Sequence, residues 1–369
     1  MPRMASPGQA GTPRGQRRQQ RPTLRDVATG AGVSVSTASL VFSGKGPVAA
    51  ATAERVRAVA SEIGFAGPNP LASSLRQGRA GVVGVVVEGR VRIAFRDPFA
   101  ISVLDGLAEE LDAIPTGLLL LGQPANDEEN LLPLIAGLAL DAVVFSLCGP
   151  ESSPLVDHLS ARGIPMFGTG VPDDKRVTQV RIDERAAGAE IARHVKRLGH
   201  RRVAHVAMSL TARSVAGPVT PEDLRGDTYL SSRDRLDGFR DVFGARAEAV
   251  QTGDGSSVEG GIVAGRALLD RPAGDRPTAV VAQSDVIAAG VVIAAEELGL
   301  RVPDDLSVTG FDGLDLPWLP HRLTTMDQHG QDKGRILGTL VRRTLGGQRP
   351  RGVTQPVHLR EGTTTAPPR

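Results

Sequence analysis

Cysteine is almost absent from this chain of 369 residues, which holds Cys148 alone. A single cysteine excludes an internal disulfide framework and is typical of a reducing compartment. No apolar run is long enough to cross a bilayer, and the Arg-, Gln- and Pro-rich N-terminus lacks the apolar region of a secretory signal. We therefore expect a cytoplasmic protein.

The sequence also lacks the short motifs of common enzyme classes. It contains no P-loop, no GxSxG elbow and no His/Cys cluster with metal-ligand spacing. His194, His200 and His205 fall in a helix-to-strand stretch, where core or surface positions are more typical than metal ligands. We predict neither enzymatic activity nor a metal or other cofactor.

Positive charge is concentrated at one end of the chain. The net charge at pH 7 is +2, yet residues 1–79 hold eleven Lys and Arg against three acidic residues, so the remainder is net negative. A basic segment on an acidic body favours contact of that segment with nucleic acid. A solvated basic tail is the alternative, because part of the excess lies before Pro22.

The length predicts two or three domains. Residues 1–21 offer little to bury and are predicted to be a disordered basic tail. Residues 22–67 are predicted to form three short helices, with Thr23 and Ser34 as caps and Gly32 in a tight turn. The second and third helices are expected at 35–42 and about 51–63. This order is typical of a helix-turn-helix DNA-binding domain, and residues 68–80 are predicted to be a hinge.

From residue 81 the pattern alternates between helical stretches and apolar runs that are typical of strands buried on both faces. The runs are 82–87, 118–121, 142–145, 203–207, 279–282 and 306–309, and the helical stretches include 101–111, 185–198, 235–243 and 285–298. The alternation predicts an α/β class with doubly wound parallel sheets. Residues 81–365 are too many for one compact sheet, so we predict two lobes and a cleft, with Thr211–Tyr229 as a loop near it.

Several segments resemble the lactose/galactose repressor (LacI-type) family of bacterial regulators. The matching stretches are TLRDVA at 23–28, AGVSVSTAS at 31–39, PNPLA at 68–72, SLR at 74–76, LGHRRVA at 198–204, RLDGF at 235–239, ELGLRVPDD at 297–305 and SVTGFD at 307–312. Their collinear order over about residues 23–365 is stronger evidence for the resemblance than any single motif. The resemblance implies a DNA-binding head, a hinge and a two-lobed core like that of periplasmic binding proteins.

By this resemblance, the second helix of the head contacts base edges in the major groove. Ser36 and Thr37 carry hydroxyls that bond to bases or phosphates, and Val35 can touch a thymine methyl, although the hydroxyls are also typical of caps and exposed surface. Leu40 replaces an arginine that many relatives have. Leu75 matches a hinge leucine that wedges into the minor groove, with packing against the core as the alternative. The predicted DNA-binding residues are Thr23, Arg25, Ser34, Val35, Ser36, Thr37, Ser39, Lys45, Arg55, Leu75 and Arg76, and Arg57 is a further candidate for a phosphate contact.

The resemblance also implies a small polar effector, such as a sugar or related metabolite, between the lobes of the core. The implied effector-binding residues are Asp97, Phe99, Arg235, Ser284, Asp285, Asp312 and Gln328. Each could instead cap a helix or form an interlobe ion pair, and Asp285 in particular resembles an N-cap. Ala100 and Ser284 stand where relatives have a second aromatic and an asparagine, respectively. Because of these differences the sequence does not identify the effector.

The sequence thus predicts a homodimeric or tetrameric regulator, and favours a repressor, on pseudo-palindromic double-stranded DNA. The alternative is a regulator of the same fold that answers to a protein partner or has no effector. A small molecule that changes both the stability of the protein and its operator affinity would favour the effector-controlled regulator over this alternative.

Overall fold

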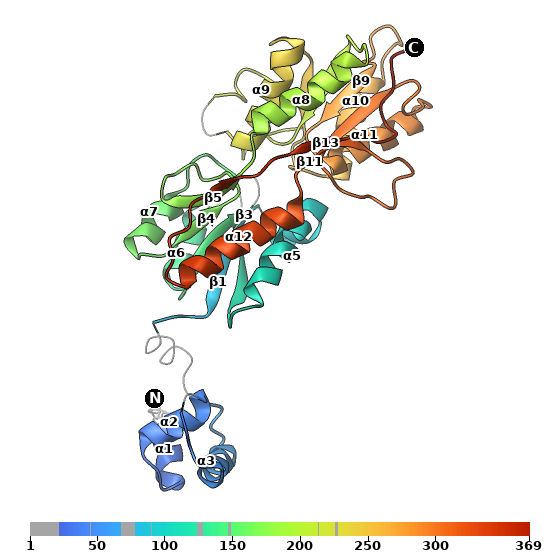
Figure 1. The fold of residues 1–369 in the computed structure, drawn as a ribbon. Helices are drawn as coiled ribbons and strands as arrows, with labels where there is room; N and C mark the ends of the chain where they lie inside the picture. The colour runs from blue at the N-terminus through green and yellow to red at the C-terminus, as the bar shows by residue number, and fades with distance from the viewer. Residues whose placement is uncertain are drawn as a thin grey trace, which may run out of the picture. The chain divides into compact units, whose positions relative to one another are not determined.

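The computed structural model describes residues 22–44, 46–67, 78–89, 91–123, 128–146, 149–212, 214–225 and 228–369. Contacts divide the chain into two compact units, residues 1–79 and 80–369 (Figure 1). The predicted positions Lys45, Leu75 and Arg76 lie outside the described residues. The same holds for Cys148.

The first unit contains the three predicted helices. They are α1 (Leu24–Gly30), α2 (Val35–Ser43) and α3 (Ala50–Glu62). Val27, Ala38 and Val56, one from each helix, are completely buried and form the centre of a small apolar core. Each helix therefore buries one narrow face and leaves the rest of its surface exposed.

The second unit begins with a lobe built on a six-stranded sheet in the order β12-β5-β4-β3-β1-β2. All its pairings are parallel. Its strands are β1 (Val82–Glu88), β2 (Gly117–Gln123), β3 (Ala142–Ser146), β4 (Met166–Gly168), β5 (Val177–Arg181) and β12 (Val353–Thr354). Its helices are the 3-10 helix η1 (Val91–Phe95), α5 (Pro98–Leu111), α6 (Glu128–Ala136), α7 (Pro154–Ala161) and α12 (Gly330–Leu345). α5 and α12 pack on one face of the sheet, and α6 and α7 on the other.

The other lobe of this unit has a seven-stranded sheet in the order β13-β11-β10-β9-β6-β8-β7. Its strands are β6 (Val203–Ala207), β7 (Gly217–Pro218), β8 (Ala249–Gln251), β9 (Ala279–Ala282), β10 (Ser307–Asp312), β11 (Thr324–Asp327) and β13 (His358–Arg360). Its helices are α8 (Glu184–Arg197), α9 (Leu230–Phe243), α10 (Val258–Leu269) and α11 (Asp285–Glu297). Helices cover both faces, while the edge strands β7 and β13 run antiparallel to their neighbours.

The predicted fold class is confirmed. All six apolar runs are strands, and the predicted helical stretches lie within or overlap α5, α8, α9 and α11. One prediction is wrong in part: Thr211–Tyr229 contains β7, which pairs with β8 and closes an edge of the sheet. A two-residue strand made of Gly and Pro shows no periodicity, so the sequence pattern could not reveal it.

Glycines let the covering helices approach closely. A Cβ atom on Gly334 of α12 would lie 2.1 Å from the carbonyl oxygen of Val103 in α5, so a side chain there would push the two helices apart. Gly188 and Gly238 play the same part between α8 and α9. In Figure 1, α12 and α5 lie side by side.

The chain passes between the two sheets three times. It does so from β5 to α8, from β11 to α12 and from β12 to β13. Parallel sheets bind ligands at the carboxyl ends of their strands. We therefore expect a ligand site near the ends of β10 and β11 and the segments that cross between the sheets.

Candidate functional site

In the head, side-chain hydrogen bonds cap the starts of α1 and α2. The Thr23 hydroxyl accepts a bond from the amide of Asp26, and the Asp26 carboxylate accepts one from the amide of Thr23 at 2.8 Å. These bonds hold the pKa of Asp26 below its usual value. Gly32 lies in the turn with φ 62°, and Ser34 caps α2 by accepting a bond from the Thr37 amide at 3.0 Å. The predicted caps and turn are confirmed.

The outer surface of α2 carries the predicted base-reading residues. Val35 is 44% exposed, Ser36 is exposed, and Thr37 and Ser39 are half-buried. The hydroxyls of Ser34 and Ser36 lie 2.7 Å apart and share a hydrogen bond. This surface combines hydroxyl groups with apolar groups, and both can contact base edges.

The candidate phosphate contacts of the head differ in their surroundings. Arg25 and Arg57 are exposed. Arg55 is also exposed, but its Nε donates a bond at 2.9 Å to the carbonyl oxygen of Ala31, in the turn before α2. Arg55 thus ties α3 to the helix-turn-helix turn, in addition to any role on DNA.

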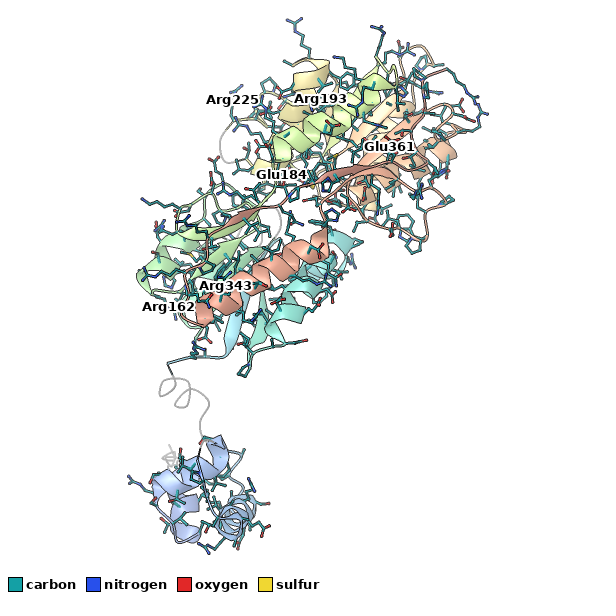
Figure 2. The ribbon with its side chains drawn as sticks, in the orientation of Figure 1. Arg162, Glu184, Arg193, Arg225, Arg343 and Glu361 are labelled. Atoms are coloured by element: carbon teal, nitrogen blue, oxygen red, sulfur yellow. The ribbon has the colours of Figure 1, made fainter. Side chains whose placement is uncertain are left out.

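In the second unit, a small cavity of about 50 Å³ that opens to solvent lies between the two lobes. Its lining residues are Asp97, Phe99, Val103, Thr169, Glu184, Met208, Ser231, Arg235, Asp312, Gln328 and Lys333. Both lobes contribute to this lining, so a ligand held there would touch both. Figure 2 shows Glu184 where the two lobes meet.

Arg235 is the most constrained charged group of this cavity. Its Nε donates to the carboxylate of Glu184 at 2.7 Å, and its Nη1 donates to the carbonyl oxygen of Gln283 at 2.7 Å. Its guanidinium lies 3.7 Å from the centre of the Phe311 ring, and the residue is 4% exposed. Arginine is suited to such a site because its planar donors are fixed relative to one another.

A second network runs along the floor of the cavity through Asp312, Gln328 and Lys333. The side-chain amide of Gln328 donates to the Asp312 carboxylate at 2.8 Å, and the Lys333 ammonium donates to the Gln328 oxygen at 2.9 Å. Burial raises the pKa of Asp312 well above its usual value, and the neighbouring Asp285 raises it further. The backbone of Asp312 has φ 130°, so the chain holds this residue in a strained conformation.

Asp97 and Phe99 approach the cavity from the start of α5. The Asp97 carboxylate caps the helix by accepting a bond from the Phe99 amide at 2.9 Å, and burial raises the pKa of Asp97. The Lys333 ammonium lies 5.5 Å from the centre of the Phe99 ring.

Two of the seven predicted effector residues lie elsewhere. Among the described residues, Ser284 and Asp285 do not line the cavity. Ser284, and not Asp285, is the N-cap of α11, and its hydroxyl also accepts a bond from Ser256 at 2.7 Å. Asp285 is fully buried, accepts a bond from the Leu314 amide at 2.7 Å and has its pKa raised to about 6 by burial. Both side chains fix local structure at the start of α11.

Four polar residues of the cavity were not predicted from the sequence: Thr169, Glu184, Ser231 and Lys333. The sequence pattern around Lys333 could have indicated its burial, because Lys333 begins a helical face that continues with Leu337, Leu340 and Val341. In the structure Lys333 is 3% exposed. A lysine on such an apolar face indicates a partner or a cavity. No sequence pattern indicates a site role for Glu184, because only the fold brings it to Arg235.

Of the core and surface positions considered for the three histidines in the sequence, the structure shows core positions for all three. His194, His200 and His205 are 6%, 3% and 2% exposed, and burial lowers the pKa of His205 to about 3. In the part of the chain that the structure describes, no three His, Cys, Asp or Glu side chains lie close enough to hold a metal ion. None of the described helices is long and apolar enough to span a membrane.

Comparisons with known proteins cover both units. The family model of bacterial regulatory proteins, lacI family, matches residues 23–69, and a periplasmic binding protein-like domain matches residues 192–365. A helix-turn-helix transcriptional regulator of Mycolicibacterium smegmatis is 30% identical over 96% of this chain and 100% of its own length. The regulator IpsA of Corynebacterium glutamicum is 31% identical over 86% of this chain and 90% of its own. A solved complex of the regulator CelR with cellobiose has a TM-score of 0.62 at 27% identity, over 93% of this chain and 100% of that one.

Proposed function

Because the chain belongs to the LacI family of DNA-binding transcriptional regulators, which are not enzymes, we propose that it is a repressor controlled by a small neutral polyhydroxylated effector. The repressor acts in the cytoplasm as a homodimer that places two heads on a pseudo-palindromic operator. The effector binds in the cavity between the lobes and changes operator affinity.

The observation that carries the effector class is that both cationic side chains of the cavity already donate to acceptors of the protein. Arg235 is engaged by Glu184, and Lys333 by Gln328. A strongly anionic ligand would have to compete with Glu184 for Arg235 and with the Gln328 oxygen for Lys333. Hydroxyl groups both donate and accept, so a sugar can bond to Asp97, Asp312 and Arg235 without breaking the ion pair. The cellobiose bound to CelR supports this class of ligand.

The link from the cavity to the hinge is supported at the first residues of the core. The amides of Ala80 and Gly81 donate to the two carboxylate oxygens of Asp141 at 2.6 and 2.7 Å. Asp141 directly precedes β3, and Gly81 precedes β1 in the same sheet. A ligand that changes the orientation of this lobe therefore moves the point at which the hinge leaves it. A coupling free energy of about 1–3 kcal/mol is typical for such a system.

The DNA side of the proposal is tested by selecting sequences from random duplex DNA with the purified full-length protein at near-physiological salt. We expect enrichment of a pseudo-palindrome. Binding that is sequence-independent and lost at moderate salt, with and without candidate effectors, would refute sequence-specific repression.

The effector side is tested by thermal shift and operator binding with a panel of neutral saccharides and their phosphate esters. We expect a neutral saccharide to change both readouts in the wild type and in Arg233→Gln, and neither in Arg235→Gln. Arg233 is a matched control because it lies on the same helix with its side chain 43% exposed. If only phosphate esters act, the neutral class is wrong, and if no compound changes both readouts, the sensor role is wrong.

A further inference from the structure

Two large apolar side chains are exposed on α2, the helix that the proposed function places in the major groove. Val35 is 44% exposed and Leu40 is 37% exposed. An exposed leucine on a short surface helix contributes little to the stability of the free head. Part of the Leu40 side chain is therefore open to a contact with a partner.

The positions of these side chains follow from helix geometry. Successive residues of an α-helix are about 100° apart. On this basis Val35, Ser39, Ser43, Ser36 and Leu40 occupy, in that order, an arc of about 140° on the outer surface. Ala38 and Val41 lie on the opposite, buried side. The outer face of α2 is thus a strip of three serines with Val35 along one edge and Leu40 along the other.

The Leu40 side chain is held in place by the segment that follows the helix. A Cβ atom built on Gly46 would lie 3.1 Å from a terminal methyl group of Leu40. The leucine therefore rests against the backbone of Gly46 on one side and presents its other side to the surroundings.

The chemistry of the major groove limits what such a side chain can contact. Of the four bases, only thymine presents an apolar group there, its C5 methyl, while the others present donors and acceptors alone. Leucine cannot bond to a donor or an acceptor, and covering one leaves it unsatisfied. A leucine at this edge of the helix therefore favours a thymine and disfavours guanine, adenine and cytosine.

We propose that Leu40 is a specificity-determining residue that selects a thymine, through its 5-methyl group, at one position in each half of the operator. Val35 makes a second contact of the same kind from the opposite edge of α2. The inference rests on the proposed function, because it requires a sequence-specific head. It goes beyond that function by assigning the base and the atom group that the head recognises.

The test uses the operator found by selection, with each thymine replaced in turn by uracil in both half-sites. Uracil differs from thymine only by the missing methyl group. Burial of one methyl group corresponds to about a fourfold change in affinity, so loss of two methyl groups is expected to weaken binding about fifteenfold. Full-length Leu40→Ala is expected to bind the thymine and uracil operators equally at that position. Leu40→Arg is expected to prefer a guanine there.

Ile63→Ala is the matched control, because Ile63 is 36% exposed in the same head but lies at the end of α3. It should keep the full response to uracil. A specific operator at which no uracil weakens binding, or a Leu40→Ala variant that responds to uracil as the wild type does, would overturn the role of Leu40 alone. A selection that returns no sequence at all would refute the proposed function, and the role of Leu40 with it.

Discussion

Replacing Arg235 by methionine should destabilise the core unit even when no effector is present. Methionine keeps an unbranched side chain next to Phe311 but removes every donor of the guanidinium. Glu184, whose side chain is 16% exposed, then loses its partner, and the carbonyl oxygen of Gln283 loses its bond.

The size of the effect follows from these two losses. Breaking a buried ion pair from one side costs about 3 to 5 kcal/mol, and an unsatisfied buried carbonyl costs about 1 to 3 kcal/mol. Because Glu184 keeps some access to water, we expect the low end, about 4 kcal/mol in total. Glu184→Gln retains an oxygen that can accept the bond from Arg235 and should cost about 1 to 2 kcal/mol.

The two changes should not add. In the double variant no carboxylate is left unpaired, so its free energy of unfolding should exceed the additive expectation by about 2 kcal/mol. Urea unfolding of the full-length variants measures this coupling. Trp318, the chain's one tryptophan, lies in the core unit and reports on that unit by its fluorescence.

Additivity within about 0.5 kcal/mol would refute the reasoning, because it would mean that the ion pair contributes nothing to the stability of the core. Arg233→Met serves as the control on the same helix. Its nearest acid, Asp237, lies 4.0 Å away on the surface, so the change should cost less than about 1 kcal/mol.

Three further predictions concern packing, titration and the hinge. Gly334→Ala places a Cβ atom 2.1 Å from a backbone oxygen of α5, so we expect a loss of about 3 kcal/mol in urea unfolding. Burial raises the pKa of Asp285 in the folded protein from 3.8 to about 6, so its stabilising effect is present below about pH 4 and is lost as the pH rises from about 4 to 6. Asp285→Asn should therefore remove up to about 3 kcal/mol of this pH dependence, measured by unfolding at a series of pH values. Leu75→Ala should weaken binding to the selected operator far more than binding to random DNA, measured by titration at fixed salt.

Each of these has a control and a contradicting result. Gly274→Ala, where an added Cβ atom meets nothing within 4 Å, should be close to neutral, and equal losses in both glycine variants would contradict the packing argument. Asp174→Asn removes an exposed carboxylate whose pKa is lowered to about 2, so it should leave the fall in stability between about pH 4 and 6 in place. An unchanged pH profile in Asp285→Asn would contradict the assignment. Equal losses on both DNAs would contradict the wedge role of Leu75.

Much of the fold was predictable because its signals are local. A β-branched run such as Val82–Val87 indicates a buried strand without knowledge of its neighbours. The caps at Thr23 and Ser34 follow from hydroxyl residues placed just before apolar helical patterns. β5, with the residues VTQVR, was not predicted because half of it is polar and it is short.

The candidate site was predictable only in part, and mainly through family resemblance. Asp97, Phe99 and Asp312 carry matching motifs, and the structure places them on the cavity. Ser284 and Asp285 carry a matching motif as well, yet they do not line the cavity. A sequence motif includes adjacent residues whether or not their side chains point in the same direction. The motif therefore could not show which of its residues face the cavity.

The sequence by itself determined the two-part organisation, the six apolar strands and the helix caps at Thr23 and Ser34, because each depends on residues close together in the chain. Only the tertiary structure decided that Glu184 pairs with Arg235 and that Lys333 reaches Asp312 through Gln328. The first partners are 51 residues apart, and the network joins strand ends and helix starts of two lobes. Such contacts depend on how the chain crosses between the two sheets, which no local pattern encodes.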